Sequence, residues 1–221
     1  MSRPSFRHSL RFENLESRQL LSGMAVTPTA QEQYMLESIN AARANPRAAA
    51  QQVTSNLTPD IVATLNHYNV DLNAAKSAIA NSPAKAPLAW NPDLAQAAES
   101  HSQDMANNQY QSHTGSDGST PEQRIQTFGY TNAKSSAENA YAYASSVDEA
   151  MQAFLIDWGV ADQGHRRNIL QANVSQDDAS TDVGIGIVSS TGKVGPLVVT
   201  QNFGKQSGNT MAQLLGVAYD D

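Results

Sequence analysis

Two histidines and two carboxylates are the residues whose side chains could do chemistry together in this sequence. They are His113, Glu138, Asp157 and His165. Two imidazoles and two carboxylates can bind one divalent cation, since imidazole suits zinc, copper, iron or nickel. The same groups can instead transfer protons, because histidine titrates near neutral pH. The sequence therefore offers a candidate metal site or acid–base site.

The four residues lie far apart along the chain, and no local metal-binding signature such as His-Glu-x-x-His is present. Spacing alone leaves open whether they converge. A simpler interpretation gives His113 a backbone hydrogen bond in its loop and lets Glu138 cap a helix or pair with Arg166. His101 is predicted to be a buried core residue, because it lies on the inner face of its helix.

A nucleophilic enzyme is not favoured. The run from Ser112 to Gly118 contains Ser, His and Asp, but its glycines and small residues are typical of turns. No Gly-x-Ser-x-Gly elbow surrounds a serine. The chain has no cysteine, which excludes thiol nucleophiles, thiolate metal sites and disulfides.

The elements that must position these residues begin at recognisable helix starts. A Ser, Thr or Asn before the first helical residue accepts a backbone hydrogen bond, and proline fits the first turn. Helices are predicted after Thr29, Thr58, Asn91, Thr120 and Ser146, with a short helical turn over residues 164–170. Strands are predicted over residues 137–144, 183–188 and 197–203, the last two forming a hairpin around residues 191–193. Helices segregated from antiparallel strands indicate an α+β fold.

The chain of 221 residues fits one domain with extensions. The domain is predicted over residues 29–206, between an export-type or disordered N-terminal segment (1–28) and a C-terminal tail (207–221). Residues 54–86 are predicted to form a helical insertion in which Ile61, Leu65 and Tyr68 share one face. No run of about 18 apolar residues is present, so no transmembrane helix is expected.

Charge narrows the class of partner. The net charge is −7, and residues 1–23 hold four arginines against two glutamates, so the remaining residues carry a net −9. Affinity for nucleic acid comes mainly from Lys and Arg on phosphates. An acidic domain therefore makes a nucleic acid or an anionic membrane surface an unexpected partner.

Several ordered motifs resemble one family. Ser112-His113-Thr114, Ala137-Glu138-Asn139, Gly164-His165-Arg-Arg-Asn-Ile-Leu and Thr200-Gln201-Asn-Phe-Gly204 occur in sequence. They resemble the motifs of the CAP superfamily, the cysteine-rich secretory, antigen 5 and pathogenesis-related proteins, and especially its cysteine-free bacterial branch. The resemblance covers about residues 30–204 and is weakest over 54–86. Ala137 stands where the family has glycine.

The resemblance implies a three-layer α-β-α sandwich with a small central antiparallel sheet and an open cleft. In that cleft His113 and His165 would bind a metal, zinc or another divalent cation. Glu138 and Asp157 would act through waters or orient the imidazoles. The family's fourth cleft residue is usually glutamate, so Asp157 is one methylene short, and Asp162 is the alternative for that position.

Three functions follow from the resemblance and the residues. The leading hypothesis is a non-catalytic binding module that takes a divalent cation and a cell-envelope ligand such as a glycan, peptide or lipid. The alternatives are a metal-dependent, peptidase-like hydrolase and a structural or adhesive envelope domain that binds through residues 54–86. A secreted or cell-envelope location is expected, since Leu15-Glu-Ser-Arg-Gln-Leu-Leu-Ser22 resembles a segment of predicted exported bacterial proteins.

Overall fold

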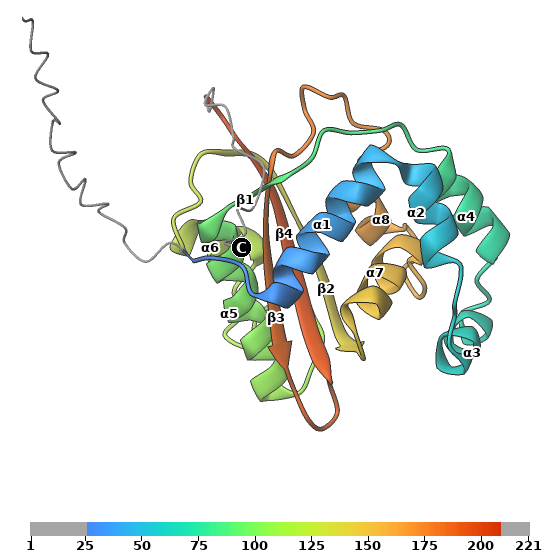
Figure 1. Ribbon diagram of the computed structural model, residues 1–221. Helices are drawn as coiled ribbons and strands as arrows, with labels where there is room; N and C mark the ends of the chain where they lie inside the picture. Colours follow the sequence, from blue (N-terminus) through green and yellow to red (C-terminus); the bar gives the residue numbers. More distant parts are fainter. Residues whose placement is uncertain (1–25, 209–221) are drawn as a thin grey trace, which may run out of the picture.

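A four-stranded sheet of order β1-β3-β4-β2 lies between two helical layers in the computed structural model, which describes residues 26–208 (Figure 1). The strands are β1 (Ala89–Trp90), β2 (Ala133–Ala144), β3 (Asp182–Ser189) and β4 (Leu197–Gln206). β4 pairs antiparallel with both β2 and β3, whereas β1 pairs parallel with β3. The expected α-β-α sandwich is confirmed, and the two-residue β1 makes its sheet mixed.

The helices divide between the two faces of this sheet (Figure 1). One layer holds α5 (Pro92–Asn108) and α6 (Pro121–Thr127), and the other holds α1 (Ala30–Ala44), α7 (Val147–Ile156) and α8 (Gly164–Leu170). Behind α1 and α7 lie α2 (Pro46–Val53) and α4 (Leu72–Ala80), and α3 (Pro59–His67) precedes α4. No helix of residues 26–208 is long and apolar enough to span a bilayer.

All five predicted helix starts are capped by the expected side chain. In each case the side-chain oxygen accepts a backbone N–H of the first turn, which satisfies a donor that the helix itself leaves unpaired. The capping residues are Thr29, Thr58, Asn91, Thr120 and Ser146. Thr29 and Thr120 also form reciprocal capping boxes with Glu32 and Gln123.

Two glycines of β3 allow α5 to lie directly on the sheet. A Cβ on Gly184 would stand 2.0 Å from the backbone nitrogen of Ala95, and one on Gly186 would stand 2.2 Å from that of Glu99. The alternation Val-Gly-Ile-Gly-Ile therefore places glycine toward α5. Ile185, fully buried between these glycines, belongs to the core cluster that also contains the side chains of α1 and α7.

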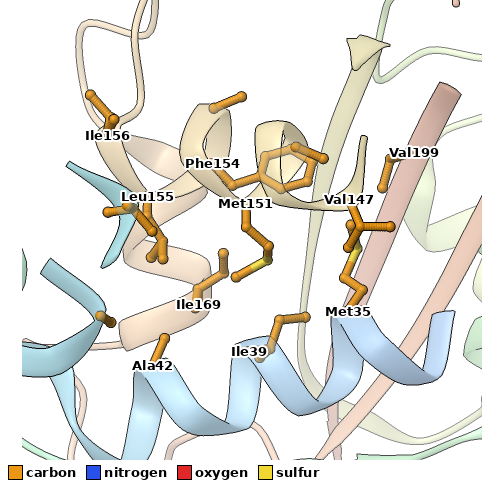
Figure 2. Close-up of a cluster of buried hydrophobic side chains, with 14 of the residues drawn as sticks. Met35, Ile39, Ala42, Val147, Met151, Phe154, Leu155, Ile156, Ile169 and Val199 are labelled. Atoms are coloured by element: carbon orange, nitrogen blue, oxygen red, sulfur yellow. The ribbon is translucent and has the colours of Figure 1, made fainter. Parts of the chain in front are cut away.

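The main core fills the space between α1, α7 and α8 (Figure 2). Ile39 of α1, Met151 and Phe154 of α7, and Ile169 of α8 are at most 4% exposed. Burying one such side chain contributes about 1.5–3 kcal/mol of hydrophobic stabilisation. This packing fixes the C-terminal end of α7 and the start of α8, which carry two of the four candidate site residues.

The segment over residues 54–86, predicted to be a helical insertion, contains α3 and α4 and joins the main core. Ile61 and Leu65 of α3 are buried, together with Ile79 of α4. Tyr68, predicted to share their face, is 51% exposed, whereas Ile61 and Leu65 are buried. Tyr68 caps the C-terminus of α3 rather than continuing it, so helical spacing no longer sets its direction. The predicted N-terminal segment and C-terminal tail fall almost wholly outside the described residues.

Candidate functional site

The structure brings His113, Glu138, Asp157 and His165 into two adjoining histidine–carboxylate pairs. Nδ1 of His113 lies 2.9 Å from Oε1 of Glu138, and Nδ1 of His165 lies 2.8 Å from Oδ1 of Asp157. The two imidazole centroids are 6.5 Å apart, with an angle of 49° between the ring planes. The loop after α5, strand β2, the end of α7 and the first turn of α8 each supply one residue.

Glu138 is held by a third group that sequence reasoning missed, the guanidinium of Arg124. Nη2 of Arg124 donates to Oε2 of Glu138 at 2.7 Å and to the backbone oxygen of His113 at 2.9 Å. Nη1 donates to the backbone oxygen of Ser119 at 2.9 Å. The Glu138 side chain is 2% exposed and that of Arg124 8%. Arg124 therefore fixes both the carboxylate and the loop that carries His113.

The expected alternative partner of Glu138, Arg166, is elsewhere. Its guanidinium donates to the backbone oxygen of Ala75, and its backbone nitrogen donates to Oδ2 of Asp157 at 3.0 Å. Burial lowers the pKa of the Arg166 guanidinium, and the nearby Asp157 carboxylate opposes that shift. The role of Arg166 at the site is thus to hold the second carboxylate through its backbone.

Asp157 is the carboxylate that contacts His165, and its backbone conformation suits a short acid. It caps the C-terminus of α7 in the left-handed region, with φ 66° and ψ 48°. Among residues other than glycine, Asp and Asn tolerate this region best. The side chain is fully buried and reaches both His165 and the start of α8. The alternative, Asp162, pairs with Arg167 on the surface and is 64% exposed.

The pKa values of the two histidines near Glu138, His113 and His101, are shifted in opposite directions. The hydrogen bond that His113 donates to Glu138 raises the pKa of His113 above its ordinary value, although burial opposes the shift. His101 of α5 is 1% exposed, and burial lowers its pKa. Its Nε2 donates to the backbone oxygen of Ser112 at 2.8 Å, so neutral His101 leaves Nδ1 as an acceptor. His101 is a buried core residue, as predicted.

Hydrogen bonds between amide side chains connect the elements that carry the site. Nδ2 of Asn168 donates to Oδ1 of Asn139 at 2.9 Å and to the backbone oxygen of Glu138 at 3.3 Å. Nδ2 of Asn139 donates to Oε1 of Gln201 at 3.0 Å and to the backbone oxygen of His165 at 3.3 Å. This network joins α8, β2 and β4 next to the two histidine–carboxylate pairs.

The donor set suits a divalent cation, with a small adjustment. Both Nδ1 atoms face carboxylates, so Nε2 of each ring is the atom left to bind a metal. With zinc–nitrogen bonds of about 2.0–2.1 Å, two imidazoles on one tetrahedral ion have centroids roughly 5 Å apart. The rings at 6.5 Å must therefore approach by about 1–1.5 Å. The His113 side chain is 55% exposed and has room to move.

No group of three or more His, Cys, Asp or Glu residues within positions 26–208 is arranged to hold one metal ion. His113 and His165 would thus form a two-ligand site, and solvent or a bound molecule would complete the coordination of the cation. Such a site stays open to a further ligand.

Comparison with known proteins identifies the family. The sequence model of the cysteine-rich secretory protein family, CAP, matches residues 36–203. The chain belongs to this family. The matched span of the CAP domain contains all four residues of the two histidine–carboxylate pairs.

Two solved structures are similar to this CAP domain. An extracellular protein containing an SCP domain from Bacillus anthracis is 28% identical over 69% of this chain, with a TM-score of 0.44. This chain spans 45% of the length of that protein. An outer surface protein of Borrelia burgdorferi is 17% identical over 64% of this chain and 91% of its own, with a TM-score of 0.43. No curated protein gave a significant match.

Proposed function

We propose that this CAP domain is an exported binding module whose cleft holds a divalent cation, zinc in the first instance, through His113 and His165. One observation carries the proposal: each imidazole already has a buried carboxylate on Nδ1, which leaves Nε2 for a metal. Metal-binding histidines nearly always donate their second nitrogen to a carboxylate, carbonyl or water, which fixes the tautomer and the ring orientation. Glu138 and Asp157 have this role.

Export is proposed on separate grounds. The family to which the chain belongs is named for secretory proteins. Residues 15–22 also resemble a segment of predicted exported proteins, although they lie outside the described residues. A secreted or cell-envelope protein would meet glycans, peptides or lipids as the ligand that completes the cation's coordination.

Binding is favoured over hydrolysis because of how Glu138 is bonded. Both of its oxygens accept hydrogen bonds, one from His113 and the other from Arg124. A general base must be within hydrogen-bond reach of the water that it deprotonates. The Glu138 side chain is only 2% exposed, which keeps bulk water from its remaining lone pairs, whereas its role in orienting His113 uses the contacts that it has.

The experiment is a calorimetric titration of zinc into the metal-free full chain, beside the double variant His113→Ala, His165→Ala. The matched control is His67→Ala, which removes an exposed histidine of α3. We expect one-site binding in the wild-type chain and in the control, and its loss in the double variant with an unchanged circular dichroism spectrum. Binding should weaken as the pH falls through the pKa of His113, because protons compete with the metal.

Zinc binding that survives in the double variant, or that is missing from the wild-type chain, would contradict the proposal. Cleavage of a broad peptide library that stops when a chelator is added would favour the hydrolase instead.

A further inference from the structure

A cavity of about 550 Å³ lies beside the proposed cation site and has His165 in its wall. Its other walls come from α3, β2, the C-terminal half of α7 and the residues that follow α7. Its volume lies within the range of about 300–1,000 Å³ that is usual for sites of small molecules. We call this cavity the aromatic pocket. A ligand that completes the coordination of a cation at His165 therefore has the aromatic pocket beside it.

Aromatic side chains give the aromatic pocket a broad apolar surface. Tyr68 is 51% exposed and Tyr143 47%, whereas Trp158 is only 8% exposed. Tyr141 packs nearly edge to face against Tyr143 and Trp158, with ring centroids 6.1 and 6.2 Å away. Because these rings contact one another, a ligand lies against them rather than between them. Exposed apolar rings around a cavity are typical of binding sites.

Hydrogen-bonding groups are interspersed with these rings. Oε1 of the exposed Gln111 accepts the backbone N–H of Ala142 at 2.8 Å, which leaves Nε2 to donate to a ligand. The hydroxyl of Thr64 donates to a backbone carbonyl and keeps lone pairs that can accept. Burial raises the pKa of Tyr141 to about 12, so its hydroxyl keeps its proton at neutral pH. The aromatic pocket therefore offers both donors and acceptors beside its apolar surface.

The lining of the aromatic pocket favours a neutral ligand. Among residues 26–208, no Asp, Glu, Lys or Arg lines it, so an ionic ligand would lack a counter-charge there. The net charge of −9 outside residues 1–23 also disfavours an anionic ligand. An acyl chain would cover the amide and hydroxyl groups without bonding to them, which costs free energy. The ligand that fits has apolar faces as well as many polar groups.

A sugar ring has this combination of properties. The C–H groups of a pyranose form apolar faces that can lie on aromatic rings, and each of its hydroxyls can both donate and accept. Two neighbouring hydroxyl oxygens can also occupy the coordination positions that two histidine ligands leave open on a tetrahedral cation. One sugar can therefore contact the aromatic pocket and the cation at the same time, because His165 belongs to both.

We propose that the aromatic pocket binds a neutral sugar residue of a glycan, and that two neighbouring hydroxyls of this sugar complete the coordination of the cation held by His113 and His165. This inference rests on the proposed cation site and names the chemical class of its ligand. In this arrangement the exposed rings of Tyr68 and Tyr143 contact the apolar face of the sugar, and Nε2 of Gln111 donates to a hydroxyl.

The test is saturation-transfer NMR on the zinc-loaded full chain, with trisaccharides of glucose, galactose, mannose and N-acetylglucosamine as probes. Calorimetry then gives the Kd of the probe that binds best. Tyr68→Ala and Tyr143→Ala should each raise this Kd about tenfold, which corresponds to ~1.4 kcal/mol. Tyr143→Phe keeps the ring and should retain most of the affinity. The matched control is Tyr34→Ala, which replaces a tyrosine of α1 that is 44% exposed and lies outside the aromatic pocket. It should leave the Kd within about twofold.

Zinc titrations separate this inference from the proposed function. The tyrosine variants should bind zinc as the wild-type chain does, whereas a chelator, or the double variant His113→Ala, His165→Ala, should raise the Kd for the sugar about tenfold or more. Zinc binding with no binding of any trisaccharide at about 1 mM would overturn the sugar site and leave the cation site intact. No zinc binding in the wild-type chain would contradict the proposed function and remove the cation-bound sugar with it.

Three further results would overturn the inference while zinc still binds. They are a Kd for the sugar that chelation does not change, a Kd indifferent to Tyr68 and Tyr143, and displacement of the sugar by a lower concentration of a sulfated trisaccharide or of a hexapeptide mixture.

Discussion

Glu138→Ala tests the role of Arg124, because it leaves a buried guanidinium without its counter-charge. Removing one partner of a buried ion pair costs about 3–5 kcal/mol. Arg124 would keep the backbone oxygens of His113 and Ser119 as acceptors, so we expect the lower end, about 3 kcal/mol. For a domain of 150–250 residues, each 1 kcal/mol lowers the Tm by about 2–4 °C, giving a decrease of roughly 6–12 °C.

The assay is urea unfolding at pH 7 followed by circular dichroism, with m-values compared to confirm that the same surface is exposed. Glu122→Ala is the matched control, since it removes an exposed glutamate of α6, and it should change stability by less than about 0.5 kcal/mol. The double variant Glu138→Ala, Arg124→Met should cost less than the two single variants together, by about 1–3 kcal/mol. A cost below about 1 kcal/mol for Glu138→Ala, or strict additivity, would refute the reasoning.

The remaining predictions concern a pKa and two packing features. NMR titration should place the pKa of His113 above its ordinary value, and Glu138→Gln should lower it, because the Glu138 hydrogen bond is the main cause of the shift. A raised folded pKa means that this contact stabilises the protein at pH values below the unfolded pKa of about 6.5, and that its contribution is lost as the pH rises through the folded pKa. Gly186→Ala should prevent folding or cost more than about 3 kcal/mol, because its Cβ would meet the backbone of α5. In the same urea series Gly118→Ala, with open space around it, should cost only about 1–2 kcal/mol for its positive φ. Arg43→Met should lower stability by about 2–4 kcal/mol in thermal unfolding, since the fully buried guanidinium donates to three backbone carbonyls. A loss below 1 kcal/mol would mean that water replaces those bonds.

Local signals predicted most of the fold. Each helix start depends on one capping side chain and its own first turn, so a short stretch such as Asn91-Pro92 is enough to locate it. The hairpin of β3 and β4 was also visible, because both strands are rich in β-branched residues and a turn joins them.

Elements that depend on distant partners could not be predicted in the same way. β1 has only two residues, and it exists because Ala89 and Trp90 pair with β3 far along the chain. β2 begins at Ala133, four residues earlier than predicted, in a polar stretch whose strand conformation comes from pairing with β4. Propensity says little where tertiary contacts decide.

The same limit applies to the candidate site. The motifs located the histidines and acids, but the choice of Arg124 rather than Arg166 as the partner of Glu138 depends on where α6 packs. Tyr68 was misplaced for a related reason, since one residue past a helix end the helical period no longer applies. The capped helix start at Thr120 was enough to place Arg124 on a helix. No local sequence feature indicated which carboxylate Arg124 would contact.

Asp157 has two structural roles, and this restricts which substitutions the site can accept. It ends α7 in a left-handed turn, and the same side chain holds His165. Replacing Asp157 with glutamate would lengthen the side chain by one methylene and would place at the turn a residue that tolerates the left-handed region less well. The position of the carboxylate and the end of α7 therefore depend on the same residue. Asparagine would keep the turn and remove the charge. A substitution that removes the charge at residue 157 is therefore compatible with the fold of this turn, whereas one that lengthens the side chain is less compatible.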